Sequence, residues 1–277
     1  MNPLMRFIIY QMKQHLIPTQ IRKIILEQAK RANVGHIGSA LSVADIITAL
    51  YFGVMNVANP DDPDRDRFIL SKGHAALALY AAFFLKNWIT AEMLNTYCSD
   101  NTALGVHPER LLTGVDFGTG SLGMGISYAV GAALAARLQN SKRRVFVLIS
   151  DAECNEGIVW ESAMFAAHHR LSNLYVIIDL NGQQALGYIQ DVLDTAPMGK
   201  KWEAFGWQVK EVDGHSPEEI MAAIQSCELE SDCPHALVAH TIFGKGVPFM
   251  ENQIKWHYWP MSAEEYQLAL EHIERHR

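Results

Sequence analysis

Apolar residues in the first third of the chain recur at the spacing of helices. Within residues 19–32 they stand three or four positions apart, so they share one face of an amphipathic helix. A second helix is predicted over 42–51, with the hydroxyl group of Ser42 as its N-cap. Another is predicted over 75–85, and one more from Thr90 onward. We therefore expect helices to come before the sheet in the chain.

The middle of the chain shows a different pattern, in which short apolar runs alternate with helical segments. The runs at 145–149 and 174–178 are flanked by polar turns, which is typical of strands covered on both faces. A helix is predicted between them over 155–167. Two further strands are predicted at 207–212 and 235–240, with a helix between them at 217–226. This alternation predicts an α/β fold with a doubly wound, mostly parallel sheet and helices on both faces.

No repeat, low-complexity tract or linker interrupts the chain. Residues 1–277 are therefore predicted to form a single α/β domain that begins with a helical segment. Residues 254–277 are expected to form an extended C-terminal tail that ends in a charged helix.

The composition is that of an ordinary globular protein. With 277 residues, of which 49% are hydrophobic, the chain can bury a large core. Its net charge of −7 argues against a nucleic-acid or anionic-membrane partner, because such surfaces bind clustered cations. The chain has no apolar run of about 18 residues for a membrane span, and residues 1–10 do not follow the pattern of a signal peptide. The four cysteines show no C-x-x-C or disulfide pattern, so we expect a cytoplasmic protein.

Two polar residues follow the central predicted strands. Asp151 comes directly after the first of them and Asn181 after the next, so both should lie at the carboxyl edge of a parallel sheet. Open α/β sheets bind ligands at this edge, and the helix between the two strands would direct its N-terminus toward a diphosphate. Carboxylate and amide oxygens suit Mg²⁺, which completes its octahedron with diphosphate oxygens and water. The pattern therefore predicts a site for a metal ion and a diphosphate.

An Asp and an Asn separated by thirty positions (181 minus 151) resemble the thiamine-diphosphate fingerprint. Eight motifs along the chain are similar to those of transketolases and occur in that family's order. They lie at 35–39, 66–74, 106–109, 119–123, 156–157, 160–161, 201–207 and 256–257. The sequence thus resembles the transketolase family over nearly its whole length. The resemblance implies the thiamine-diphosphate-binding fold, and within it the domain that binds the diphosphate.

The resemblance also implies roles for individual residues. Asp151, Asn181 and the backbone carbonyl group of Gln183 would bind Mg²⁺. The residues implied to contact thiamine diphosphate are Ser39, His74, Gly120, Ser121, Leu122, Asp151, Ala152, Asn181 and His257. The residues implied to act in catalysis are His36, His74, His107 and His257. Imidazole groups suit such a role because they exchange protons near neutral pH, and Lys72 is a further polar candidate beside them.

The chain departs from the family pattern at three places. The usual Gly-Asp-Gly is Ser-Asp-Ala at 150–152, where Ala152 still offers a backbone N–H to a phosphate oxygen. Phe243 stands where the family has a lysine, and Tyr258 replaces the glycine that usually follows Trp-His. We therefore expect an altered sugar preference or weaker cofactor binding.

Full-length transketolases continue into a pyrimidine-binding domain and a further C-terminal domain, and the sequence matches neither. In that family a Glu of the pyrimidine-binding domain acts on the aminopyrimidine ring of the cofactor. The resemblance therefore implies a separate partner subunit that carries this domain, in an α2β2 heterotetramer. The implied reaction transfers a two-carbon ketol unit from a ketose, or its phosphate, to an aldose or its phosphate.

Other classes of function fit the sequence less well. Residues 118–123 match G-x-G-x-x-G, the motif of nicotinamide-dependent dehydrogenases. That class is disfavoured because no predicted strand comes directly before the motif and no acidic residue lies about twenty positions further on. A zinc hydrolase is disfavoured because His168 and His169 are adjacent rather than one helical turn apart. Two alternatives stay open, namely a regulatory or scaffold paralogue with a degraded cofactor site, and a ketol transferase for an unusual sugar.

Overall fold

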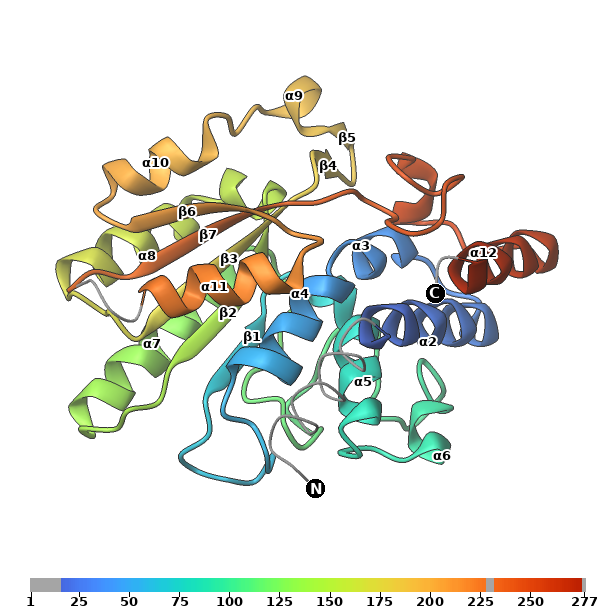
Figure 1. Ribbon diagram of the computed structural model, residues 1–277, viewed down its shortest axis with the longest axis horizontal. Helices are drawn as coiled ribbons and strands as arrows, with labels where there is room; N and C mark the ends of the chain where they lie inside the picture. Colours follow the sequence, from blue (N-terminus) through green and yellow to red (C-terminus); the bar gives the residue numbers. More distant parts are fainter. Residues whose placement is uncertain (1–15, 228–231, 276–277) are drawn as a thin grey trace.

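The computed structural model describes residues 16–227 and 232–275. Their main feature is a five-stranded sheet in the order β1-β2-β3-β7-β6, in which every neighbouring pair is parallel. Helices cover both faces of this sheet (Figure 1). The strands are β1 (Arg67–Leu70), β2 (Val145–Ser150), β3 (Leu174–Leu180), β6 (Gln208–Asp213) and β7 (His235–His240). The prediction of a mostly parallel α/β sheet is confirmed.

The central strands are buried on both faces, because their side chains alternate between two hydrophobic clusters. In β2, Phe146 and Leu148 belong to the first cluster, whereas Val147 and Ile149 belong to the second. All residues of β2 are buried. This explains why the sequence shows an unbroken apolar run here instead of an alternating one.

The first cluster includes residues from helices of both ends of the chain. The elements that contribute buried residues to it are α2 (Ile17–Ala32), α3 (Ile37–Ser42), α4 (Ala44–Ala49), the π-helical turn η1 (Leu50–Val54), α5 (Ala76–Leu85), α6 (Ala91–Leu94), α11 (Pro217–Cys227) and α12 (Ala263–Arg275). Helix α12 packs along α2 (Figure 1). The charged helix predicted near the C-terminus is therefore present, and Ala269 and Ile273 attach it to the core.

The second cluster is covered by three helices, α7 (Met124–Leu138), α8 (Gly157–His168) and α10 (Met198–Ala204). The fully buried Trp202 anchors α10, with its ring centroid 5.5 Å from that of Trp160 and 4.8 Å from that of Trp207. Between β3 and α10 the chain forms the short hairpin β4 (Gln183–Gln184) and β5 (Gly187–Tyr188), followed by α9 (Ile189–Val192). Three short 3₁₀ turns complete the elements, η2 (Gly73–Ala75), η3 (Ala152–Asn155) and η4 (Ile254–His257).

Two predictions about the first third of the chain were wrong. Strand β1 lies among the helices that were expected to precede the sheet, because its four residues are too short a run to show a period. Ser42 is not an N-cap, since it is the last residue of α3. Its hydroxyl group lies 3.0 Å from the carbonyl oxygen of Ser39 and donates a hydrogen bond to Asp179 at 2.9 Å.

None of the helices in the described parts of the chain is long and apolar enough to cross a membrane. The expectation that residues 1–10 form no signal peptide concerns a segment outside the described residues. The same holds for the last two residues of the predicted tail, 276–277.

Candidate active site

A pocket of about 340 Å³ lies at the carboxyl edge of the sheet. Segments that follow β1, β2, β3 and β7 meet there, which is where parallel sheets place their ligands. The predicted site residues that line this pocket are His36, Ser39, His74, His107, Gly120, Leu122, Ala152, Asn181, Gln183 and His257, together with Lys72. The fold thus brings residues from distant parts of the sequence into one concave site.

Three histidine rings form a triangle in this pocket. The ring centroids of His36, His74 and His257 lie between 5.3 and 5.5 Å apart. They come from separate segments, because His36 precedes α3, His74 lies in η2 and His257 ends η4. The backbone of His36 is left-handed, with a φ of 60°. Its N–H donates to the carbonyl oxygen of His257 at 3.1 Å, which ties two of the segments together.

A fourth histidine, His107, lies beside two glycines. A Cβ atom at Gly73 would come within 3.0 Å of the His107 ring, and one at Gly120 within 3.6 Å. The absence of a side chain at 73 therefore lets this ring lie against the backbone that carries His74.

Burial favours the neutral form of the three imidazoles in the triangle, those of His36, His74 and His257. It lowers the pKa of His36, and His107 adds a smaller effect in the same direction. Burial and the charge of Lys72 lower the pKa of His74 well below its ordinary value. Burial, followed by His36, lowers the pKa of His257 to about 4. A neutral imidazole can accept a proton at one nitrogen and donate one at the other, as proton exchange with a sugar hydroxyl requires.

Asp151 and Asn181 lie at the ends of adjacent strands, as predicted from their positions. One oxygen of the Asp151 carboxylate accepts a hydrogen bond from the next residue's N–H at 2.8 Å, and the other accepts from the N–H of Gly182 at 2.7 Å. Oδ1 of Asn181 accepts from the N–H of Gln183 at 2.9 Å. Asp151 is fully buried, and burial, followed by the charge of Asp179, raises its pKa to about 7. A cation beside Asp151 would offset the cost of burying this carboxylate.

Asp179 is a second buried carboxylate, beneath the pocket, and it orients Asn181. It forms a fully buried ion pair with Lys72. It also accepts hydrogen bonds from the hydroxyl groups of Ser42 and Thr241 and, at 2.8 Å, from Nδ2 of Asn181. Burial raises the pKa of Asp179, but Lys72 and these hydrogen bonds outweigh it, so the net change is a decrease. Lys72 therefore faces an anionic partner rather than standing free in the pocket.

Sequence reasoning missed Asp179 and a further buried carboxylate, Glu153. Asp179 is the one charged residue in β3, and Glu153 lies three positions after the end of β2. An acidic residue inside or beside a buried strand is itself a signal, because a carboxylate is buried only where donors or cations surround it.

Several buried polar atoms of the pocket residues have no hydrogen-bond partner among the described residues. They are Nδ1 of His36 and of His257, both polar side-chain atoms of Gln183, and Nε2 of Gln184. Buried polar atoms are normally paired. Their presence around one pocket therefore fits a polar ligand with both donor and acceptor groups, such as a diphosphate and a sugar.

Two of the predicted residues do not line this pocket. Asp151 lies beneath it and lines a neighbouring pocket of about 330 Å³, which Asn181 and Gln183 also line. Ser121 lies between two lining residues but is itself exposed. The three predicted metal ligands are thus found together where the two pockets adjoin.

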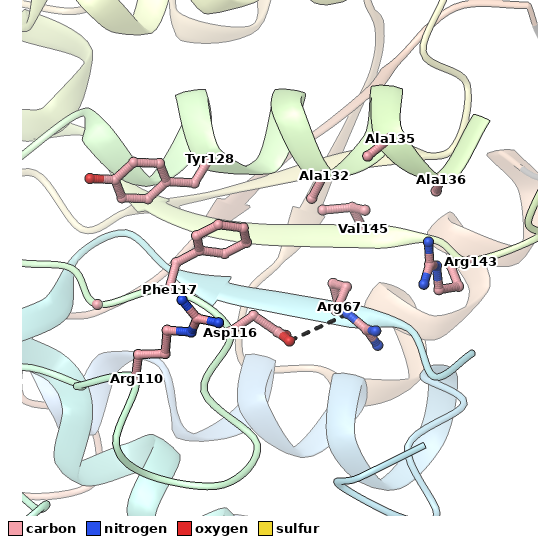
Figure 2. A pocket seen from close by; sticks show the side chains of 11 residues that line it. Arg67, Arg110, Asp116, Phe117, Tyr128, Ala132, Ala135, Ala136, Arg143 and Val145 are labelled. Carbon is pink, nitrogen blue, oxygen red and sulfur yellow. Dashed lines mark ion pairs between the residues drawn. The ribbon is translucent and has the colours of Figure 1, made fainter. Parts of the chain in front are cut away.

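A larger pocket, of about 520 Å³, lies at the opposite edge of the sheet (Figure 2). It is lined by α7 and by the first residues of β1 and β2, Arg67 and Val145, and Asp116 pairs with Arg67 there at 3.3 Å. Its size does not make it the active site. It contains none of the predicted cofactor or catalytic residues, and it lies at the amino ends of the strands.

Two of the unusual residues of the sequence, Phe243 and Tyr258, both line the histidine pocket. The buried ring of Phe243 stacks on that of His257, with centroids 5.8 Å apart and an interplanar angle of 14°. Tyr258 is 58% exposed, and its ring centroid lies 5.0 Å from that of His257. An apolar ring thus occupies a position where a cation was expected, and a phenol hydroxyl group is added at the open side of the pocket.

The fold and the pocket define a domain that binds a ligand between the carboxyl ends of parallel strands. The chain belongs to the transketolase family, since the family model described as "Transketolase, thiamine diphosphate binding domain" matches residues 13–273. It is 40% identical over 258 residues to the 6-deoxy-6-sulfo-D-fructose transketolase subunit SqwG of Clostridium sp. (strain MSTE9), covering 92% of this chain and 94% of that protein. It is 38% identical over 254 residues to an apulose-4-phosphate transketolase subunit of Phocaeicola vulgatus, covering 91% and 90%.

Solved transketolases share the fold. The transketolase of Campylobacter jejuni superimposes with a TM-score of 0.85 at 28% identity, over 95% of this chain and 43% of that one. A transketolase mutant from Pichia stipitis gives 0.85 at 29% identity, over 92% and 40%. The chain therefore spans about two fifths of the length of these solved proteins, but nearly the whole length of the two subunits named above.

These comparisons confirm the resemblance found in the sequence. They also confirm that the chain is a subunit of a transketolase-type transferase and that it contains the thiamine-diphosphate-binding domain. The interpretation as a non-catalytic scaffold is not favoured. Three relatives that match over at least 90% of their own length are named as subunits of transketolases.

Proposed function

We propose that this chain is the thiamine-diphosphate- and Mg²⁺-binding subunit of a transketolase whose pyrimidine-binding domain lies on a separate partner subunit. The pair would transfer a two-carbon ketol unit from a ketose to an aldose. One observation carries the proposal: four histidines from separate segments line the same pocket as the residues that follow β2 and β3.

The proposed ligands of Mg²⁺ are the side chains of Asp151 and Asn181 and the backbone carbonyl group of Gln183. One carboxylate and two amide-type oxygens suit this ion, which takes its remaining ligands from diphosphate oxygens and water. A site of this kind needs few charged side chains. It is therefore compatible with the absence, within the described residues, of any cluster of three or more His, Cys, Asp or Glu side chains that could hold a metal.

The cofactor would be held by residues on the same edge of the sheet. The proposed contacts are Ser39, His74, Gly120, Ser121, Leu122, Asp151, Ala152, Asn181 and His257. When bound, thiamine diphosphate supplies the nucleophilic carbon and the electron sink for cleavage of a carbon–carbon bond. The unpaired side-chain atoms of Gln183 and Gln184 are available to orient polar groups of a ligand.

The chain's own part in catalysis would be proton exchange with the sugar. His36, His107 and His257 are proposed to hold and move protons at the hydroxyl oxygens of the substrate, with His74 beside them. Their shared pocket supports this role, and so does the environment that keeps the rings of His36 and His257 neutral.

We further propose that the chain acts as a single domain, in an α2β2 heterotetramer in the cytoplasm. One family model spans residues 13–273, and the described residues share one main sheet, which supports the single domain. Relatives named as transketolase subunits support a separate partner. The cysteine pattern supports a reducing compartment.

The proposal is tested by titrating the purified chain with thiamine diphosphate and Mg²⁺, alone and with the partner subunit. Asp151→Ala should abolish Mg²⁺-dependent binding while the circular dichroism spectrum stays that of the folded chain, whereas the exposed Asp100→Ala should bind like the wild type. Unchanged affinity in Asp151→Ala would exclude this carboxylate as a ligand. A wild-type complex that binds no cofactor would contradict the proposed function.

The sugar is tested by offering several donors to the reconstituted complex. Two relatives are named for 6-deoxy-6-sulfo-D-fructose and apulose 4-phosphate, so these sugars and ordinary ketose phosphates form the panel. Release of an aldose shortened by two carbons from any of them supports the ketol transfer. No product from any donor, in a complex that binds the cofactor, would contradict it.

A further inference from the structure

Glu153 is a fully buried carboxylate that lies outside the set of predicted site residues. It does not line the histidine pocket, and no lysine or arginine in the described parts of the chain forms an ion pair with it. A buried carboxylate without a paired cation must be held by hydrogen bonds.

Those hydrogen bonds reach both oxygens of the carboxylate. Oε1 accepts from the hydroxyl group of Ser71 at 2.5 Å and from the N–H of Gly123 at 2.8 Å. Oε2 accepts from the N–H of Ser150 at 2.8 Å. Each oxygen therefore faces at least one backbone or side-chain donor, and the group is used entirely as an acceptor.

The three donor residues belong to the three segments that carry the proposed cofactor residues. Ser71 follows β1 and comes just before Lys72 and His74. Gly123 follows the loop 120–122 and is the N-cap of α7. Ser150 ends β2 and immediately precedes Asp151. One side chain thus links all three segments behind the pocket.

Glu153 also reaches the N-terminus of helix α7, where it accepts from the N–H of the N-cap residue Gly123. Gly123 has a φ of 80°, which favours glycine, so no capping hydroxyl or carboxylate is present at that position. An N–H at the N-terminus of a helix needs an acceptor outside the helix, and Oε1 of Glu153 is the acceptor here.

Packing around Gly125 shows how closely α7 meets the segment after β1. A Cβ atom at Gly125 would lie 2.4 Å from the Ser71 hydroxyl oxygen and 2.7 Å from the Ser71 Cα atom. The first turn of α7 therefore lies directly against this backbone. Little space is left for α7 to move relative to Ser71.

We propose that Glu153 is a positioning residue of the cofactor site, which sets the loop 120–122 in register with Asp151 and His74 without touching the cofactor. This inference rests on the proposed function, because it assigns those three segments to cofactor binding.

The geometry requires a carboxylate in particular. In Glu153→Gln one oxygen becomes an NH₂ group, which would face either the N–H of Gly123 or that of Ser150. Two donors would then oppose each other in a buried site, which is unfavourable. Glu153→Asp keeps two acceptor oxygens but shortens their reach by one methylene group.

The experiment measures the Kd for thiamine diphosphate, with Mg²⁺ present, of the chain assembled with its partner subunit. Glu153→Gln should raise this Kd at least about tenfold, which corresponds to about 1.4 kcal/mol. Ser71→Ala removes one donor and leaves both backbone bonds, so it should raise the Kd much less.

Asp45→Asn is the matched control for a loss of stability. Asp45 is also a buried carboxylate that accepts several hydrogen bonds, but its partners are Arg22 and His215, and none of the three lines the histidine pocket. Asp45→Asn should lower the melting temperature and leave the Kd for the cofactor unchanged. If Glu153→Gln does not fold, Glu153→Asp takes its place, with a Kd expected above that of the wild type.

Each outcome decides one question. Failure of the wild-type complex to bind thiamine diphosphate would overturn the proposed function. Binding by the wild type with the same Kd in the Glu153 variants would overturn the positioning role alone. An equal rise of the Kd in Asp45→Asn would overturn it too, because the effect would then follow stability in general.

Discussion

Position 38 shows how tightly the residues around the histidine pocket are packed. A Cβ atom at Gly38 would lie 2.1 Å from the ring of Phe243, which is itself buried and stacked on His257. Gly38 lies within α3, where its backbone is helical, so the ring rather than the backbone conformation excludes a side chain. Glycine at this position therefore positions the aromatic ring that closes the pocket.

Gly38→Ala should consequently lower the free energy of unfolding by about 1–3 kcal/mol, as overpacking of a buried site does. Urea denaturation would measure the change. Adding Phe243→Leu should restore part of the loss, because the smaller side chain makes room. Gly131→Ala is the control: nothing lies within 4 Å of a Cβ atom at this exposed position in α7. It should be neutral or stabilising by up to about 1 kcal/mol. A stable Gly38→Ala would contradict the packing argument.

His107 allows the catalytic proposal to be separated from cofactor binding. Its ring lies beside Gly73 and Gly120, within reach of the other histidines. His107→Ala should lower kcat by about 10²–10⁴-fold, the range for loss of a proton-transferring group. The Kd for thiamine diphosphate should change little. Steady-state kinetics with the partner subunit, together with a cofactor titration, measure both quantities, and a normal kcat would remove His107 from the catalytic set.

At the scale of residues, the location of a polar residue can be predicted from the sequence when its neighbours along the chain form a recognisable element. The location of Asp151 and Asn181 at the carboxyl edge of the sheet was predicted correctly, because each residue directly follows a strand. Asp179 and Glu153 were missed because their partners are far away in the sequence. Asp179 pairs with Lys72, and Glu153 binds Ser71. No local pattern shows such a contact before the strands are placed side by side.

Among the elements, α2 is attached to the core by a buried ion pair. Arg22 of α2 pairs with Asp45 of α4, and both side chains are less than 10% exposed. Nδ1 of His215 lies 2.8 Å from Asp45, and its Nε2 accepts from the N–H of Ile242 at 2.8 Å. Since Nε2 is an acceptor, Nδ1 carries the proton. Burial raises the pKa of Asp45, but Arg22 and His215 outweigh this and lower it overall.

Asp45→Ala should therefore destabilise the chain strongly, by about 3–5 kcal/mol, because Arg22 is left buried without its partner. Glu274→Ala is the matched control, since its pair with Lys23 of the same helix is 35% and 49% exposed. Exposed pairs contribute about 0–1 kcal/mol. Thermal unfolding of both variants gives the comparison. Equal losses in the two would show that burial does not determine the strength of the Arg22 pair.

Elements with a clear period or an unbroken apolar run were predicted, and those without one were not. Strands β2, β3 and β7 were found within two residues, because burial on both faces requires continuous apolar runs. Helix α7 was not predicted. Its Gly and Ala residues leave no contrast between a buried and an exposed face, although it buries Ile126, Ala129 and Ala133 in the second cluster.

At the scale of the whole molecule, the fold brings histidines from distant parts of the chain into one pocket. His36 and His257 are more than two hundred positions apart in the sequence. Burial is the main effect that opposes the charging of His74 and His257, and the crowding of Lys72 and the neighbouring histidines around them acts in the same direction. In the unfolded chain this crowding is absent and each ring takes up a proton near pH 6.5. Folding is therefore linked to pH through this cluster.

The lowered pKa of His257 predicts the direction in which the free energy of unfolding changes with pH. Its folded pKa of about 4 lies below the ordinary value of 6.5, so between these pH values the unfolded chain binds the proton and the folded chain does not. Stability is then lost as the pH falls from about 6.5 toward 4, at up to about 1.4 kcal/mol per pH unit. The raised pKa of Asp151 has the opposite effect, because it makes the folded chain more stable as the pH falls. The pH dependence of the wild type is therefore the sum of both effects. The difference in free energy of unfolding between a His257 variant and the wild type isolates the contribution of His257.

His257→Asn removes this contribution, so its free energy of unfolding relative to the wild type should rise as the pH is lowered from 7 to 4.5. Urea titrations at several pH values, without cofactor, give the difference directly. Gly131→Ala, at an exposed position in α7, changes no titratable group and should run parallel to the wild type. A constant difference between His257→Asn and the wild type would show that His257 takes up its proton as readily in the folded chain as in the unfolded one. The crowded histidines would then not be kept neutral by the fold.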